Sequence, residues 1–502
     1  LKATGGKLNI FADNPKLVRI AAFPLNIMIQ PRVAPAFADC GIDSRPGSDA
    51  LALIHRHLPE AVPTPVRRGP LDGGITQVGL FAFDADATAM AEAQGATDDM
   101  PLRSWFEDAG ILVSRSTPGT EPLFSAAFKG GHNGEHHNHN DVGSFVIAVE
   151  GTAFLLDPGG EVYTRRTFSP QRYVSKVLNS YGHPVPIVAG TLQKTGSAAR
   201  AQVLAADFSA DTDRLLLSLK DAYAVPQLTR LERLFENHRE AHTMVIEDRV
   251  AFSSPQAFGT ALVTYERVFQ RPDGTVVVFA AEGAVEVAVE TTGGDWVTEI
   301  EEIENPGRPS PKRLGFNLVA PAREASIRFT IRPVPLAADL PGVYVAPEVG
   351  PGFEPDLDAA LTVEGEAFSQ QEGGDVTVCS KVGASGQAFK FWDQPGHALT
   401  WTFTVPASGR YAIQVRACQD NSTDTSRTVL VDGRPAAVPG PTVFFPRTGG
   451  WSSTADDWRD LYLAVGGKAL VAELDAGKHT VTLLAEVKGG LNLDWIRLVP
   501  LR

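Results

Sequence analysis

Residues 129–141 read KGGHNGEHHNHND and are followed by VGSFVIAV at 142–149. The second part is apolar and rich in β-branched residues, which predicts a strand. Alternate side chains of a strand share one face, so His137 and His139 are expected side by side, with the cluster on or just before the sheet. Four of the eleven histidines lie within eight residues here. Such a cluster binds a metal or surrounds an anionic substrate, with a solvated polar loop as the alternative.

Further candidate ligands follow along the chain. Asp157 stands at the end of an expected strand in LLDPGG, and His183 follows in NSYGHPVP. Two imidazoles and a carboxylate from separate strands suit zinc. A turn-capping role for Asp157 and an ordinary strand-end role for His183 remain open. Glu135 and His136 flank the cluster and are candidate substrate contacts.

The composition limits the class of protein. At roughly 150 residues per domain, 502 residues predict three domains. The 47 glycines and 36 prolines favour short strands over long helices. A net charge of −14 argues against nucleic-acid binding, although a locally basic cleft can still bind an acidic sugar. No apolar run is long enough to span a membrane.

Four segments are expected. Residues 1–75 are predicted to be the helical end of a larger domain, because SDALALIHRHL at 48–58 has a capping Ser48 and helical apolar spacing. Short apolar or alternating runs between Gly, Asp, Asn and Pro predict a large β-sandwich over 76–345. A Pro- and Gly-rich linker at 346–356 and a small β-domain at 357–502 follow.

The histidine-rich region resembles a known protein family. FKGGHNGEHHNHNDVGSFVIAVEGTAFLLDPG, at 128–159, and RYVSKVLNSYGHPVPIVAG, at 172–190, closely resemble the C-terminal β-domain of the heparinase II/III-like polysaccharide lyases. The resemblance runs from about Trp105 to Ile331. It implies an antiparallel supersandwich preceded by an (α/α) toroid, with substrate in the cleft between them. The helical segment 1–75 then corresponds to the end of the toroid.

The resemblance also implies roles for single residues. His139, Asp157 and His183 match zinc ligands whose metal is mainly structural. His137, the first histidine of HNH, matches the histidine that faces the substrate.

A tyrosine is expected in the same site. Tyr173 lies where some relatives place an active-site tyrosine, and Arg172 beside it could counter a substrate carboxylate. Tyr163 and Tyr181 are rival candidates. A buried tyrosine with a satisfied hydroxyl is the structural alternative for all three.

The implied reaction is β-elimination on a uronic-acid polymer such as alginate or a glycosaminoglycan. Such an enzyme neutralises the C5 carboxylate, removes the C5 proton and protonates the departing O4. The expected partners are an acidic polysaccharide and the N-terminal toroid, which in this family supplies further catalytic residues. A secreted or periplasmic bacterial enzyme is expected, and a homo-oligomer is possible. A non-catalytic glycan-binding protein and a zinc-dependent hydrolase are the alternatives.

Tryptophans concentrate near the C-terminus. Trp401 lies in an alternating strand at 399–405 and Trp495 in another strand pattern, so both are expected in the core. Trp392, Trp451 and Trp458 fall in Gly- or Asp-rich loops and are candidate sugar-stacking residues.

The last segment resembles carbohydrate-binding modules of the galactose-binding jelly-roll type. Glu364, Glu366 and Asp494 match positions that often hold a structural calcium in those modules. Cys379 and Cys418 can either pair in an oxidising compartment or remain buried thiols.

Overall fold

The chain forms two compact units, Leu1–Val334 and Pro335–Arg502, in a computed structural model. The structure describes residues 15–62, 100–271, 273–280, 283–335, 340, 352–421, 425–436, 442–465, 467–486 and 488–502. Most of the predicted linker at 346–356, and both ends of the predicted helical segment 1–75, therefore lie outside the described residues.

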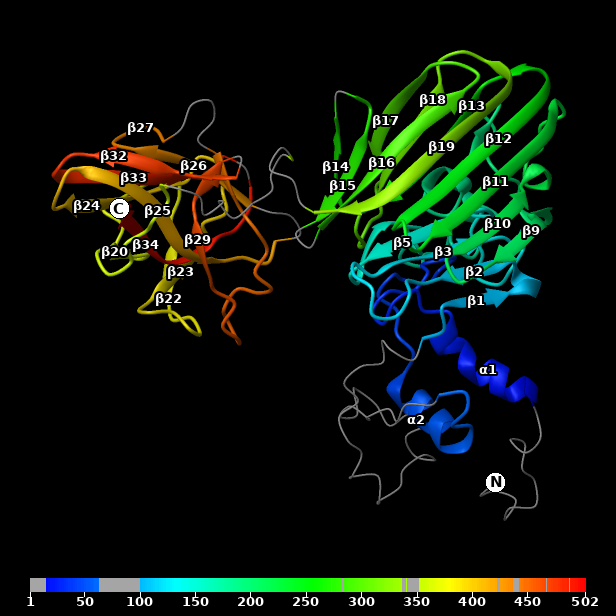
Figure 1. Cartoon of the computed structure of the whole chain (residues 1–502), viewed down its shortest axis with the longest axis horizontal. Coiled ribbons are helices and arrows are strands. Elements are labelled where there is room, and N and C mark those ends of the chain that lie inside the picture. Colours follow the sequence, from blue (N-terminus) through cyan, green and yellow to red (C-terminus); the bar gives the residue numbers. More distant parts are fainter. Residues whose placement is uncertain are drawn as a thin grey trace. The chain divides into compact units, whose positions relative to one another are not determined.

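Among the described residues before the first strand, two segments form α-helices. They are α1 (Pro15–Asn26) and α2 (Ser48–His57), drawn in blue in Figure 1. The predicted helix at 48–58 is confirmed, but Gly47 is its N-cap and no side chain caps it, so the capping role predicted for Ser48 is wrong. Phe23 of α1 packs edge-on against Phe106, with ring centroids 5.4 Å apart.

Antiparallel strands build the rest of this unit, which confirms the predicted mainly β sandwich. One sheet has the order β1 (Arg103–Phe106), β2 (Ile111–Ser114), β3 (Phe124–Lys129), β5 (Phe145–Val149), β6 (Thr152–Leu155). The largest sheet has the order β14 (Arg267–Gln270), β15 (Val276–Ala280), β16 (Gly283–Thr292), β19 (Ala322–Val334), β12 (Thr243–Gln256), β11 (Leu228–His238), β10 (Thr212–Ser218), β9 (Gln202–Phe208).

Two smaller sheets complete the first unit. The four-stranded sheet has the order β17 (Trp296–Glu302), β18 (Lys312–Leu318), β13 (Phe258–Thr264), β7 (Ile187–Val188). A short ribbon pairs β4 (His132–Asn133) with β8 (Gly196–Arg200).

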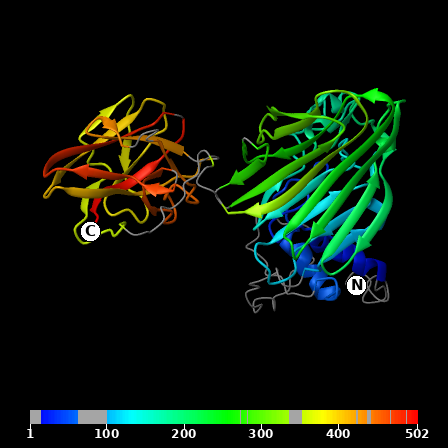
Figure 2. The ribbon, with the colours of Figure 1, turned by 45° about the horizontal axis from the view of Figure 1, so that its top comes forward.

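Apolar faces of these sheets pack on one another. Phe128 of β3 stacks on Phe235 of β11 with centroids 4.5 Å apart, which joins the five- and eight-stranded sheets. Phe316 of β18 meets Phe329 of β19 at 4.8 Å, which joins the four- and eight-stranded sheets. Each fully buried phenylalanine contributes about 1.5–3 kcal/mol. Figure 2 shows the green strands of the large sheet beside the cyan strands of the five-stranded sheet.

A second apolar layer covers the other face of the five-stranded sheet. Ile29, Val33 and Phe37 are buried there against Val113 and Val146. Strands β3 and β5 are consequently buried at every position, as expected for strands covered on both faces. This packing fixes the backbone just before residue 39 against the sandwich.

The C-terminal unit is a small jelly roll of antiparallel sheets. One sheet contains β20 (Leu361–Glu364), β34 (Asn492–Pro500), β25 (Gly409–Cys418), β29 (Arg459–Tyr462) and β32 (Val471–Leu474). The other contains β21 (Gln370–Glu372), β24 (Ala398–Val405), β33 (Gly477–Leu484), β26 (Thr425–Val431), β27 (Arg434–Pro435) and β28 (Thr442–Phe445). Two short ribbons pair β22 (Thr377–Cys379) with β23 (Ala388–Lys390) and β30 (Ala464–Val465) with β31 (Lys468–Ala469). The predicted alternation in β24 is confirmed, with Leu399, Trp401, Phe403 and Val405 buried.

All three cysteines are free thiols. Cys418 is buried and Cys379 is partly exposed, so the structure has no pairing between them. Among the described residues, no helix has both the length and the apolar character needed to cross a bilayer.

Candidate functional site

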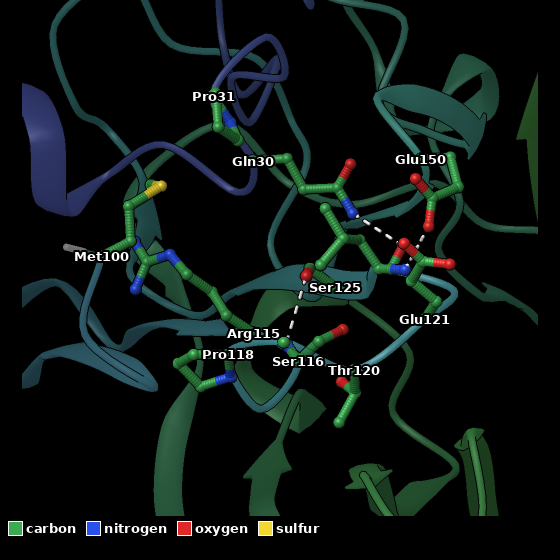
Figure 3. A pocket seen from close by; sticks show the side chains of 12 residues that line it. Gln30, Pro31, Met100, Arg115, Ser116, Pro118, Thr120, Glu121, Ser125 and Glu150 are labelled. Carbon is green, nitrogen blue, oxygen red and sulfur yellow. Dashed lines mark hydrogen bonds between the residues drawn. The ribbon is translucent and has the colours of Figure 1, made fainter. Parts of the chain in front are cut away.

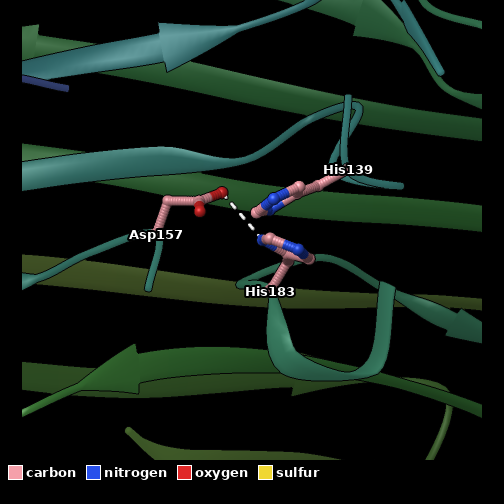
Figure 4. A group of neighbouring side chains, drawn as sticks. All are labelled: His139, Asp157 and His183. Atoms are coloured by element: carbon pink, nitrogen blue, oxygen red, sulfur yellow. Dashed lines mark hydrogen bonds and ion pairs between the residues drawn. The ribbon is translucent and has the colours of Figure 1, made fainter. Parts of the chain in front are cut away.

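His139, Asp157 and His183 meet inside the first unit. Asp157 follows β6, while the two histidines come from irregular segments that precede β5 and β7. All three are fully buried, and one possible ligand atom from each lies within 4.8 Å of the others. The side chains point toward one another in Figure 4. The structure thus brings together the three predicted zinc ligands.

The hydrogen bonds of this cluster leave two ring nitrogens without a partner. Asp157 Oδ2 lies 2.8 Å from His183 Nδ1 and accepts a 2.6 Å hydrogen bond from the Ser144 hydroxyl. Nδ1 of His139 and Nε2 of His183 are buried with no hydrogen-bond partner. An unpaired buried nitrogen is costly unless something binds it. Two imidazoles and one carboxylate therefore fit a metal ion that accepts nitrogen and oxygen ligands.

The protonation of the cluster differs between its two histidines. Burial alone would lower the pKa of His183, but the charge of Asp157 and its hydrogen bond outweigh burial and raise it, so this ring must lose a proton when it binds a metal. Burial lowers the pKa of His139, so this ring is neutral near pH 7 and keeps a lone pair. Burial alone would raise the pKa of Asp157, but the charge of His183 and its hydrogen bond outweigh burial and lower it. A neutral imidazole and an ionised carboxylate are the forms that bind metals.

Asp39 connects the buried cluster to the surface. Its Oδ1 lies 2.9 Å from His139 Nε2, and its Oδ2 lies 3.0 Å from His137 Nδ1. The same carboxylate accepts hydrogen bonds from the Tyr163 hydroxyl at 2.7 Å and from Arg172 at 3.1 Å. Burial alone would raise the pKa of Asp39, but hydrogen bonds from His139, Tyr163 and His137 hold it well below its usual range.

An ionised Asp39 determines the tautomers of both histidines. A carboxylate only accepts, so His139 must donate from Nε2 and His137 from Nδ1. The lone pair of His139 is then at Nδ1, the buried nitrogen without a partner. In neutral His137 the lone pair is at Nε2. The His137 side chain is 64% exposed, so this one carboxylate directs one histidine inward and the other outward.

Close backbone contacts hold Asp39 in place. A Cβ atom on Gly159 would lie 2.3 Å from the carbonyl oxygen of Cys40, and one on Gly160 would lie 3.2 Å from Cα of Asp39. Only glycines allow this approach, and Gly159 also has a positive φ of 68°. The LLDPGG turn therefore does more than end β6. Asp39 was missed in the sequence because it lies 100 residues before His139, in a segment assigned to the helical part.

The prediction that His137 and His139 share one face of a strand is wrong, whereas their position just before a strand agrees with one of the two placements expected for the cluster. β4 ends at Asn133 and β5 begins at Phe145, so both histidines lie in the connection between these strands. His137 has a φ of 57°, a left-handed conformation that turns the chain and points the two rings differently. The exposed and the buried histidine are thus separated by backbone geometry rather than by strand alternation.

Tyr163, a rival candidate in the sequence, is the tyrosine beside His137. Its hydroxyl is 3.1 Å from His137 Nδ1. Tyr173 lies in a short 3₁₀ helix, Arg172–Val174, and its hydroxyl is 3.4 Å from the carbonyl oxygen of Asn138. The Tyr173 ring packs on Val177, Leu178 and Ile303. The Tyr181 hydroxyl donates to Glu301.

Of the other predicted substrate contacts, His136 and Glu135 have accessible surface, whereas Arg172 is already hydrogen-bonded within the protein. His136 is exposed, and Glu135 is half-buried with a carboxylate oxygen 3.7 Å from Lys129 Nζ. Arg172 is occupied: besides Asp39, it donates to the carbonyl oxygens of Asn138 and Thr167 at 3.1 and 3.2 Å. The prediction that Arg172 is available to a substrate carboxylate is therefore wrong, because its donors already hold the loop together.

Two of the three predicted sugar-stacking tryptophans are buried. Trp392 is fully buried and donates from Nε1 to the carbonyl oxygen of His397 at 3.0 Å. Trp458 is 3% exposed and donates to the carbonyl oxygen of Val382 at 2.9 Å. Both loops fold inward, so stacking on these rings is excluded in this conformation. Trp451 is half-buried.

The three predicted calcium ligands gather around one loop of the jelly roll. Asp494 Oδ1 accepts from the Ser385 backbone N–H at 2.9 Å, and the Ser385 hydroxyl donates to Glu364 at 2.8 Å. Glu366 accepts from the Gln387 backbone at 3.2 Å, and its other oxygen is buried without a partner. Arg416 Nε lies 3.3 Å from Asp494, so part of the negative charge is already balanced.

A polar cavity elsewhere in the first unit is already satisfied internally. Figure 3 shows it lined by Gln30, Arg115, Ser116, Glu121, Ser125 and Glu150 among others. Gln30 donates to the Leu123 carbonyl at 2.9 Å and accepts from Gly151 at 2.6 Å. Arg115 donates to the Met28 carbonyl at 2.7 Å. These groups support the chain that carries Asp39, so the cavity is structural.

Part of the β-sandwich matches a known family in sequence. Residues 99–306 match the family described as heparinase II/III-like, C-terminal. The resemblance predicted from the histidine-rich stretch is therefore confirmed for this part of the chain. No curated protein matches the chain in sequence.

Several solved structures are similar. The heparan sulfate lyase HepC from Pedobacter heparinus is 15% identical, with a TM-score of 0.44, covering 70% of this chain and 48% of that one. A structure described as heparinase III is 15% identical, with a TM-score of 0.44 and coverage of 72% and 51%. A family 35 carbohydrate-binding module from Clostridium thermocellum is 19% identical, with a TM-score of 0.23 and coverage of 28% and 97%. The chain spans about half the length of these lyases.

Proposed function

We propose that this chain carries the β-sandwich part of a polysaccharide lyase that cleaves a uronic-acid-containing polymer by β-elimination. The main support is the arrangement around Asp39. The exposed His137 is hydrogen-bonded through Nδ1 to this carboxylate, and the Tyr163 hydroxyl lies beside the same nitrogen. A fixed imidazole with a lone pair at its exposed nitrogen suits proton abstraction from a bound sugar. The family of residues 99–306 agrees with this chemistry.

In the proposed reaction, Nε2 of His137 takes the C5 proton of a uronate residue. The electron pair of the broken C5–H bond forms the C4–C5 double bond as the C4–O4 bond breaks. The protonated ring can return its proton to the departing O4, and Asp39 stabilises the imidazolium formed in between. The hydrogen bond to Asp39 raises the pKa of Tyr163, so this phenol remains protonated. Its hydroxyl donates to Asp39 and thereby helps to hold this carboxylate against His137.

We also propose that His139, Asp157 and His183 hold zinc. Bound zinc would link three separate segments of the sandwich next to the site, as structural zinc does in other proteins. All three ligands are fully buried, which leaves no open route for a metal-bound water to reach a polysaccharide. This burial argues against the alternative of a zinc-dependent hydrolase.

The remaining expectations stay proposals. The toroid that would complete the catalytic site is proposed as the partner of this sandwich, with α1 and α2 as its last helices. Calcium at Glu364, Glu366 and Asp494, and a secreted or periplasmic location, are proposed on the family resemblance.

The test is ultraviolet absorbance during incubation of the full protein with alginates and glycosaminoglycans. Elimination creates a conjugated double bond and raises the absorbance on the correct polymer. His137→Ala should abolish the rise, and Tyr163→Phe should reduce it more than Tyr173→Phe, because only Tyr163 contacts both Asp39 and His137. Binding without any rise on every polymer would instead support a non-catalytic glycan-binding protein.

A further inference from the structure

Two aromatic rings next to His137 are left uncovered by the fold. Phe168 is 70% exposed and Tyr163 is 47% exposed. Their rings meet edge-to-face, with centroids 5.0 Å apart and planes at 76°. The His137 and Tyr163 rings lie nearly parallel, with centroids 6.4 Å apart. The three rings form a continuous row, which we call the aromatic ledge, that begins at the proposed catalytic histidine.

The loop that carries the ledge is held rigidly. Glu161 is buried at its base and accepts hydrogen bonds from Thr167 and Ser175, both at 2.8 Å, and from Arg166. Arg172 ties the same loop to Asp39. A loop with this many internal hydrogen bonds does not need Phe168 for its own stability. The rings of Phe168 and Tyr163 together therefore form an exposed aromatic surface on a firmly held loop.

Positive charge lies close to the ledge. Arg165 is an exposed member of the loop. The loop containing Arg308 lies against it, because a Cβ on Gly307 would be 3.2 Å from Cγ2 of Val162. Arg308 is exposed, and no described residue forms an ion pair with it or with Arg165. Arg308 is also close enough to Tyr163 for its charge to act on the phenol. On a protein of net charge −14, an unpaired guanidinium group beside the aromatic ledge favours an anionic ligand.

We propose that the aromatic ledge is a sugar-binding subsite, in which the C–H face of a pyranose ring packs on Phe168 and its acidic group faces Arg308. The occupant is an acidic polysaccharide, and the subsite positions the residue next to the one at His137. Pyranose rings offer the flat apolar C–H surfaces that aromatic side chains bind, while their charged groups need cations nearby. An apolar peptide would fit the rings but not the unpaired arginines. This inference rests on the proposed function.

The test measures binding separately from turnover. Full-length protein with His137→Ala is titrated calorimetrically with tetrasaccharides of heparan sulfate and of alginate, with and without Phe168→Ala. Removal of one aromatic contact should weaken binding about tenfold. Phe168→Tyr should restore binding, because it keeps the ring. Val319→Ala, which alters another exposed apolar side chain, is the matched control and should have no effect.

The charge contact has its own measurement. Arg308→Gln should weaken binding several-fold at low salt and much less at high salt, because salt screens an exposed charge pair. Unchanged affinity in Phe168→Ala would overturn the subsite, whether or not the enzyme turns over. A protein that yields no unsaturated product on any polymer, but still loses affinity in Phe168→Ala, would contradict the proposed elimination and retain the subsite.

Discussion

Asp39 and His137 are 98 residues apart in the chain, yet Asp39 Oδ2 lies 3.0 Å from His137 Nδ1. The other oxygen of the same carboxylate contacts His139. One side chain from the segment before the sandwich therefore orients an exposed histidine and a buried one together. A carboxylate that accepts a hydrogen bond from one ring nitrogen of an imidazole determines that the other nitrogen carries the lone pair.

Asp39→Asn should lower kcat/KM on the responding polymer by about 10- to 100-fold. The amide can offer an N–H group where His137 now donates, which disturbs the tautomer with little change in volume. Asp43→Asn, an exposed acid in the same segment, is the control. A normal rate in Asp39→Asn would show that Asp39 does not position His137.

His137→Ala and His139→Ala should fail in different ways. The first should reduce turnover by about 10²–10⁴-fold with an unchanged melting temperature, because the ring is exposed. The second should lower the melting temperature and the zinc content, because it removes a buried ligand. Thermal unfolding and metal analysis of both purified variants check this. Equal loss of stability in both would contradict the separate roles.

Removal of metal should destabilise the wild-type protein. If zinc occupies the cluster, chelation should lower the melting temperature of the first unit, and added zinc should restore it. His183→Ala should remove the response to chelator. An identical melting temperature before and after complete metal removal would argue that the cluster is held by hydrogen bonds alone.

Glu161 should make the stability of the first unit depend on pH. Burial alone would raise its pKa, but hydrogen bonds from Arg166, Ser175 and Thr167 outweigh burial and lower it. A carboxyl whose pKa is lower in the folded state stabilises above its unfolded pKa of about 4.3 and loses that contribution as pH falls further. Glu161→Gln should cost about 1–3 kcal/mol at neutral pH and less in acid.

Denaturant unfolding at several pH values measures this difference. Glu324→Gln, on the exposed face of β19, is the control and should be neutral. A cost for Glu161→Gln that stays constant from neutral pH to acid would show that the ionised carboxylate is not what stabilises the loop.

Trp392→Ala should destabilise the C-terminal unit by about 3–5 kcal/mol, because a fully buried ring leaves a cavity. Its guanidinium neighbour Arg427, 4.2 Å from the ring centroid, would lose a contact as well. Arg427 is itself buried, and burial lowers its pKa to about 9. Separate unfolding transitions of the two units, followed by calorimetry, would show the loss in one unit only. Reduced glycan affinity with unchanged stability would restore the stacking role.

Sequence patterns predicted the sheets well because one buried face produces an alternating pattern and two buried faces produce a continuous apolar run. β24 and the strand at 145–149 are clear cases. The three buried ligands were also predictable, since HNH, LLDPGG and YGHP are short local signals. These three side chains do lie together in the structure, while their role as a site and the bound metal stay predictions.

Contacts between distant segments could not be predicted in the same way. Asp39 carries only a weak signal, an acid after the apolar run that ends at Phe37, and nothing local points to His139. The exposure of aromatic side chains could not be predicted either. The Gly- and Asp-rich loops suggested accessible tryptophans, but Trp392 and Trp458 are buried. The exposed ring of Phe168 was not predicted. Burial of a loop side chain depends on the whole packing arrangement, which has no local period.

The position of β19 limits how this protein can be divided into working pieces. The family match ends at residue 306, before β18 and β19, although β19 lies between β16 and β12 in the large sheet. A gene fragment cut to the matched bounds would leave β12 and β16 without the strand between them and β13 and β17 without β18, and unpaired strand edges promote aggregation. It would also lack Asp39. The smallest fragment to express is therefore the whole unit Leu1–Val334, which extends beyond the family match at both ends.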